Sequence, residues 1–148
     1  VLEAVSNGAV SNEELPFSSY RDLEIEGAAV RALRITYVGE LGFELQLPIA
    51  SAGAVYDALM NAGAHHGIVN AGYRAIESLR LEKGYRAWAS DLTANDTPFE
   101  AGLGWAVKLD SEIDFLGREA LVLMKSEAMT RRLVGFTFDD PDVTLLGR

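Results

Sequence analysis

Residues 23–47 decide the fold, and they read LEIEGAAVRALRITYVGELGFELQL. Within this stretch, apolar and polar residues alternate over 23–25, 33–37 and 43–47. A two-residue period indicates a β-strand with one buried face, and the glycines that separate the three runs are typical of turns. The pattern therefore predicts a meander of three antiparallel strands.

The period changes after this segment. Apolar residues recur at helical spacing over 51–63 and 73–83, which predicts two amphipathic helices. Residues 86–101 have no sustained period and are expected to form a long loop, a kind of segment that often carries function in compact domains. Alternation returns at 105–109 and 133–138, and both runs are predicted to be strands.

Asp114 can cap a further helix between these two strands, and that helix carries Leu121 and Met124. Strands followed by helices and more strands predict an α+β fold, an antiparallel sheet packed with helices. The apolar stripes of these elements predict a main core of Leu33, Ile35, Phe43, Leu45, Val55, Leu59, Ile76, Leu79, Trp105, Val107 and Leu121. Truncating Leu79 to alanine should then cost about 2–5 kcal/mol.

Composition excludes several classes of protein. The 148 residues are 49% hydrophobic, which argues against disorder, and the absence of cysteine excludes a disulfide scaffold or a zinc-thiolate site. The net charge of −9 makes nucleic acid and anionic membranes unfavourable partners. With no apolar run long enough to span a bilayer, we expect a cytoplasmic protein; a mitochondrial matrix location fits equally if a transit peptide was removed.

The chain begins at Val1 without methionine. We interpret it as a piece of a longer protein with two parts: residues 1–130 as the C-terminal part of one domain, and 131–148 as the start of a truncated following domain.

Most catalytic motifs are missing from the sequence. It contains neither a Gly-x-Gly-x-x-Gly fingerprint nor a phosphate loop, and the adjacent pair His65-His66 lacks metal-ligand spacing, so no metal site is predicted. The remaining candidates are Tyr37, Glu44 and Arg74. Arg74 falls in the first turn of a predicted helix, where a cation is unfavourable unless an anion or an electron-rich ligand meets it. The alternative is a solvated glutamate and a surface arginine.

Four ordered motifs resemble those of the glycine-cleavage T-protein (aminomethyltransferase) family. They are YVGELGFEL at 37–45, AGYRAIESLRLEKG at 71–84, DTPFEAGLGW at 96–105 and DFLGREAL at 114–121. The phrases VGELG at 38–42 and EKGYRAW at 82–88 resemble the dimethylglycine and sarcosine dehydrogenase subgroup of that family.

The resemblance implies a T-protein-like fold that binds tetrahydrofolate, with Tyr37, Glu44 and Arg74 as cofactor-binding residues. The chemistry agrees, because a tyrosine ring can stack on a flat pterin and a carboxylate can accept hydrogen bonds from its N–H edge. Glu40 competes with Glu44 for this role, but its place between two glycines favours a turn. We expect Tyr37 and Glu44 to share one cavity wall, an outcome that depends on the register of their hairpin.

The resemblance also implies a one-carbon transferase whose partners are folate and a small amine donor or an aminomethyl carrier protein. The family's catalytic aspartate is expected upstream of this chain, so no catalytic residue is assigned and the chain alone is expected to be inactive. Two alternatives remain open: the folate-binding region of a flavin-dependent dimethylglycine or sarcosine dehydrogenase, and a non-catalytic folate-binding regulatory module.

Overall fold

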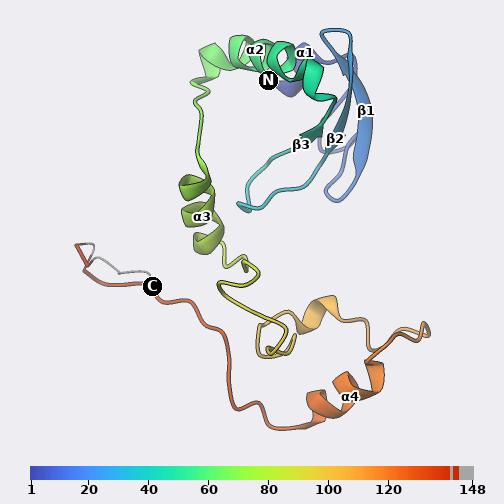
Figure 1. Ribbon diagram of the computed structural model, residues 1–148, viewed down its shortest axis with the longest axis vertical. Helices are drawn as coiled ribbons and strands as arrows, with labels where there is room; N and C mark the ends of the chain where they lie inside the picture. The colour runs from blue at the N-terminus through green and yellow to red at the C-terminus, as the bar shows by residue number, and fades with distance from the viewer. Residues whose placement is uncertain (141, 144–148) are drawn as a thin grey trace. The chain divides into compact units, whose positions relative to one another are not determined.

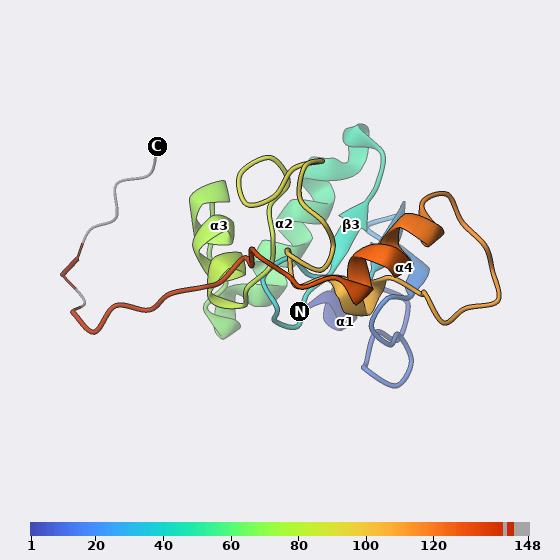
Figure 2. The same cartoon turned by 90° about the horizontal axis from the view of Figure 1, so that it is seen from below.

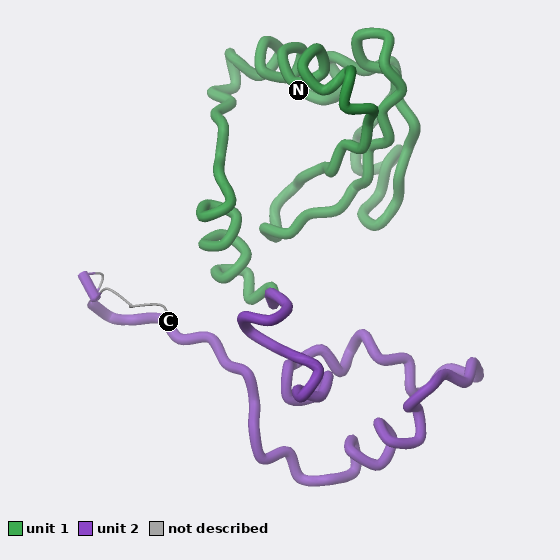
Figure 3. The backbone as a smooth tube through the Cα atoms, in the orientation of Figure 1, with its two compact units in different colours: residues 1–85 green, residues 86–148 purple. Residues whose placement is uncertain are grey.

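The computed structural model describes residues 1–140 and 142–143. The chain divides into two compact units, residues 1–85 and 86–148 (Figure 3). Figure 1 labels the helices and strands: α1 (Leu2–Val5), β1 (Tyr20–Ile25), β2 (Ala28–Leu33), β3 (Glu44–Gln46), α2 (Ala52–Gly63), α3 (Tyr73–Glu82) and α4 (Arg118–Ser126). Short 3-10 turns lie at Ile49–Ser51, Ala64–His66 and Gly104–Ala106. The α+β class is confirmed. The domain boundary predicted at residue 130 stays a prediction, and part of its second domain lies outside the described residues.

The first unit contains the predicted meander. Its sheet has the order β1-β2-β3 with antiparallel pairing throughout. Ile25 pairs with Ala28, so the first hairpin turns on Glu26 and Gly27 alone. Both residues have positive φ, 51° and 73°, as a two-residue turn matched to strand twist requires. The first and third predicted strands are confirmed. The position of the second was wrong, because β2 covers 28–33 and shares only Leu33 with the run predicted at 33–37.

A hydrophobic core joins one face of this sheet to α1 and α2. Figure 1 shows both helices along the same side of the sheet, and Figure 2 shows α2 beside β3. The largest fully buried side chains, each at 1% exposure, are Leu15, Ile25 and Val30. The cluster is completed by Leu2, Val10, Leu23, Ala32 and Val55. These contacts place the outer face of the sheet away from the helices.

The buried face of β2 was wrongly predicted. Val30 and Ala32 face the core, and Arg34 continues that face at 7% exposure, whereas Leu33 and Ile35 are only half-buried. The Arg34 guanidinium is accommodated because Nη2 donates to Asn12 Oδ1 at 2.6 Å and Nη1 to the Gly42 carbonyl at 3.3 Å. Local alternation misled here because a buried, hydrogen-bonded arginine resembles a surface residue in sequence.

The other core expectations are confirmed in part, since Val55 belongs to the cluster and Phe43, Leu45 and Leu59 pack against it. Phe43, Leu45, Leu59, Ile76, Val107 and Leu121 are half-buried, and Val55 is buried, but Leu79 is 42% exposed and Trp105 77% exposed. The helices predicted at 51–63 and 73–83 are confirmed as α2 and α3. Because Leu79 keeps so much contact with solvent, the large cost predicted for its truncation no longer follows.

The second unit departs furthest from the sequence prediction. Residues 104–106 form a 3-10 turn instead of a strand, and 133–138 form no strand. A strand needs a partner to satisfy its backbone groups, and no extended strand is paired with either segment in the described part of the chain. The predicted helix is confirmed as α4, but Gly117 with φ of 88° precedes it, and Asp114 accepts only from the neighbouring Phe115 N–H.

Among residues 1–140 and 142–143, no helix has the length and apolarity that crossing a membrane requires.

Candidate functional site

The loop between β2 and β3 is held against the end of α3. Gly39 has φ of 71°, and a Cβ built on it would lie 2.5 Å from Lys83 Cγ. The chain can therefore pass this close to the lysine stem only with glycine at that position. Glu40, the next residue, forms an ion pair with Lys83 at 2.8 Å. Glu40 is thus engaged by a cation of the same chain, whereas its predicted role in the turn stays a prediction.

The ion pair sets the protonation of both partners. The hydrogen bond from Lys83 and its positive charge lower the pKa of Glu40. The same hydrogen bond and charge interaction raise the pKa of Lys83. Both side chains are well exposed, at 65% and 45%, so salt will screen the pair and its contribution to stability is small.

Tyr37 lies within this loop and contacts a second aromatic ring. Its ring centroid lies 6.1 Å from that of Tyr85, with the planes tilted by 42°, a geometry within the favourable range for aromatic pairs. Tyr37 remains 39% exposed. One side of its ring is thus braced while the side chain still reaches solvent.

Tyr85 is itself fixed by a buried arginine. Arg80, at 2% exposure, donates from Nη1 to the Tyr85 carbonyl at 2.9 Å, and its own carbonyl accepts from the Tyr85 N–H at 2.9 Å. The Arg80 guanidinium also pairs with Glu77 on the same helix. Sequence reasoning missed Arg80 and Tyr85, although both lie in or beside the 71–84 motif.

Glu44 lies on the outer face of the sheet. It begins β3, is exposed, and pairs in register with Leu33, which pairs in turn with Tyr20. Nearby Arg31 is engaged by Asp22 in a bidentate contact at 2.8 and 3.0 Å. No ion pair or side-chain hydrogen bond reaches Glu44 from any residue that the structure describes. Its carboxylate is therefore available to a ligand.

Arg74 lies in the first turn of α3 and is exposed. Its end of the helix is opposite to the end that contacts the Tyr37 loop. Within the described ranges, no carboxylate pairs with Arg74 and no contact joins it to Glu44 or Tyr37. That the three form one site, and that Tyr37 and Glu44 share a wall, stay predictions. Tyr37 lies beyond the end of β2, so strand alternation does not decide where its ring points.

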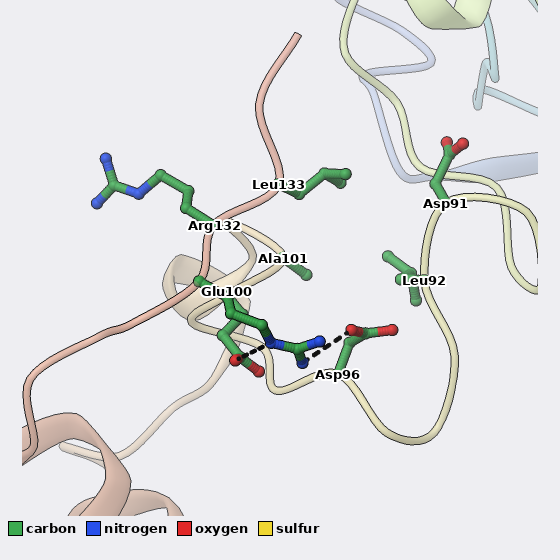
Figure 4. A pocket seen from close by; sticks show the side chains of 8 residues that line it. Asp91, Leu92, Asp96, Glu100, Ala101, Arg132 and Leu133 are labelled. Atoms are coloured by element: carbon green, nitrogen blue, oxygen red, sulfur yellow. Dashed lines mark hydrogen bonds and ion pairs between the residues drawn. The ribbon is translucent and has the colours of Figure 1, made fainter.

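A separate pocket lies in the second unit, in the segment expected to be a functional loop (Figure 4). Its volume is about 210 Å³, and its lining is Asp91, Leu92, Asp96, Glu100, Ala101, Arg131, Arg132 and Leu133. Arg131 joins Glu100 at 3.0 Å and Asp96 at 3.3 Å. None of the three predicted site residues is in this lining.

Glu100 in this pocket has a strongly lowered pKa. The hydrogen bond from Arg131, followed by bonds from the Thr97 N–H and hydroxyl, lowers the pKa of Glu100 from 4.5 to about 2. Thr97 and Glu100 also satisfy one another's backbone N–H groups at 2.9 and 3.2 Å, a reciprocal pattern that Thr-x-x-Glu at 97–100 could have revealed. The contact with Arg131 had no local signal.

Comparison with known proteins decides the family. The model of the GCVT N-terminal domain matches residues 1–111. The chain belongs to this family. The match includes the four residues considered for the ligand site, Tyr37, Glu40, Glu44 and Arg74. The resemblance drawn from the motifs is confirmed.

Individual relatives of this GCVT domain chain come from both expected groups. Human mitochondrial sarcosine dehydrogenase is 52% identical over 140 residues, 95% of this chain and 15% of that protein. Human mitochondrial dimethylglycine dehydrogenase is 41% identical over 143 residues, 97% of this chain and 16% of that protein. An aminomethyltransferase of Halothermothrix orenii is 44% identical over 136 residues, 92% of this chain and 37% of that protein. The chain thus spans only a minor part of each relative.

Proposed function

We propose that this chain supplies part of the tetrahydrofolate site of a one-carbon transferase of the T-protein type. The observation that carries the proposal is the 37–44 signature. In one GCVT domain, it combines an exposed tyrosine ring with a glutamate that has no cation partner among the described residues. The other acid of the signature, Glu40, is already paired with Lys83.

The residues present fit a reduced pterin. The Tyr37 ring offers a face for stacking. Glu44 offers a charged acceptor for two N–H donors on the pterin edge. Arg74, at a helix N-terminus where its own charge is unfavourable, gains from a carbonyl or carboxylate of the ligand. Tetrahydrofolate, when bound, supplies the nitrogen atoms that accept the one-carbon unit; this chain's residues bind and orient it.

The names of the relatives support one class of one-carbon donor. Sarcosine and dimethylglycine dehydrogenases are among the relatives, which favours an N-methylated glycine over an aminomethyl carrier protein. A carboxylate that moves protons at the reacting amine is expected outside this chain, as part of the parent protein. The two relatives are named mitochondrial, which favours the matrix over the cytoplasm.

The test is calorimetric titration of 5-formyltetrahydrofolate, a folate that resists oxidation, into the chain and two variants. Glu44→Gln should weaken binding roughly 10- to 150-fold, because it removes the charge from a hydrogen-bonded acceptor. Glu40→Gln is the matched control and should weaken binding about fivefold at most, because its exposed ion pair contributes little.

If Glu40→Gln weakens folate binding more than Glu44→Gln does, the residue that binds the pterin edge is Glu40. A chain that binds no folate, with its fold intact by circular dichroism, would overturn the proposed function.

A further inference from the structure

The loop that carries the folate signature has little internal support. At its start, the Arg34 N–H donates to the Ser19 carbonyl at 2.8 Å and the Arg34 carbonyl accepts from the Ser18 N–H at 3.0 Å. From residue 35 to residue 43, no strand pairing holds it among the described residues. The polar contacts described within it are the Val38 N–H to Thr36 Oγ1 at 3.2 Å and Arg34 Nη1 to the Gly42 carbonyl at 3.3 Å. A loop with so few bonds loses conformational entropy when a ligand orders it.

The end of α3 supplies the missing support. Its contacts with the loop include the Tyr37–Tyr85 ring contact, the close approach of Gly39 to the Lys83 stem, and the Glu40–Lys83 ion pair. Of the three, only the ring contact touches a residue assigned to the ligand. The ion pair is exposed and screened by salt, whereas an aromatic contact is not.

We propose that Tyr85 is a positioning residue that holds the Tyr37 ring ready to stack on the pterin. The proposal rests on the proposed function, since it takes Tyr37 as a folate contact. Tyr85 suits this role because both of its backbone polar groups bond to Arg80, which is buried on α3. A ring fixed to a helix in this way can order a ring on a loop before the ligand arrives, which lowers the entropic cost of binding.

The first test compares substitutions of Tyr85 by titration with 5-formyltetrahydrofolate. Tyr85→Leu keeps an apolar side chain but removes the ring, and it should weaken binding about two- to twelvefold, the contribution of one aromatic pair. Tyr85→Phe keeps the ring and should bind within about twofold of the unmodified chain. Tyr56→Leu is the control, because Tyr56 is 46% exposed on α2 and bonds only to Asn70 among the described residues.

The second test needs no ligand. In a chain with ¹³C-labelled tyrosine rings, Tyr85→Leu should shift the NMR signals of the Tyr37 ring, because the ring current of its neighbour is lost. Tyr56→Leu should leave those signals in place. Unmoved Tyr37 signals in Tyr85→Leu would show that the two rings do not meet in solution, and would overturn the inference.

The results separate this inference from the function on which it rests. If Glu44→Gln loses affinity while Tyr85→Leu binds normally, or if Tyr85→Phe is as weak as Tyr85→Leu, the positioning role is wrong and the folate site stands. If Tyr85→Leu weakens binding while Glu44→Gln does not, the assignment of Glu44 fails and the positioning role stands.

Discussion

The two units of this chain differ in the interactions that stabilise the interior of each one. In residues 1–85, buried aliphatic side chains from the sheet, α1 and α2 form one cluster. In residues 86–148, the buried apolar side chains among those described are Ala101 and Leu109. Polar links do more there: Arg118 Nη2 bonds to the Leu109 carbonyl at 2.7 Å, and Arg131 joins two acids. The stability of the first unit should therefore fall when buried side-chain volume is removed. The contacts of the second unit should change with pH and with the loss of charged side chains.

The largest effect is expected in the core of the first unit. Ile25→Ala removes a side chain at 1% exposure and should lower the free energy of unfolding by about 2–5 kcal/mol. Leu79→Ala, at 42% exposure on α3, should cost about 1 kcal/mol or less. Denaturant melts of both variants measure the difference, and equal costs would show that α3 packs as tightly as the sheet.

A smaller effect is expected where the signature loop meets α3. Gly39→Ala forces a positive φ on an alanine and drives its Cβ into the Lys83 stem, so it should destabilise by at least about 1–2 kcal/mol. Gly53→Ala is the control: it lies in α2, where an added Cβ meets nothing within 4 Å, and it should stabilise by about 0.5–1 kcal/mol. If thermal melts show both substitutions to be stabilising, the loop is not held against the helix.

The smallest effect, local and dependent on pH, is expected in the second unit. The pKa of Glu100 is about 2 in the folded chain, against an ordinary 4.5. The stabilisation that its ionised carboxylate gives to the folded chain is therefore fully present above about pH 4.5. It is lost as the pH falls from there through about 2. The Leu133 N–H bonds to the Glu100 carbonyl at 2.8 Å, so its NMR signal should report the loss across that interval.

Arg131→Gln should move this response to higher pH, because it removes the main cause of the low pKa and leaves only the bonds from Thr97. Arg132→Gln serves as its control, because Arg132 lines the same pocket but has no ion pair within the described part of the chain. A Leu133 signal that follows the same curve in both variants would exclude Arg131 as the link.

Local patterns predicted much of the fold where neighbours in sequence are also neighbours in space. The first strand, the turn at Gly27, the helices α2 and α3, and the order of the three strands all follow from short periods and glycine turns. The position of the second strand does not, because β2 covers 28–33 instead of the alternating run at 33–37. The same reasoning failed at 105–109 and 133–138, because alternation shows only that a segment could be a strand. Whether it becomes one depends on a partner strand elsewhere.

For the site, residue types and spacing were enough to indicate the family and the candidates at 37, 44 and 74. They gave no sign that Tyr37 contacts Tyr85, that Arg34 and Arg80 are buried, or that Arg131 reaches Glu100 from 31 positions away. The physical reason is that residue type and spacing act over one or two turns of chain. Burial of an arginine or contact between distant rings depends instead on the summed packing of segments that no local period relates.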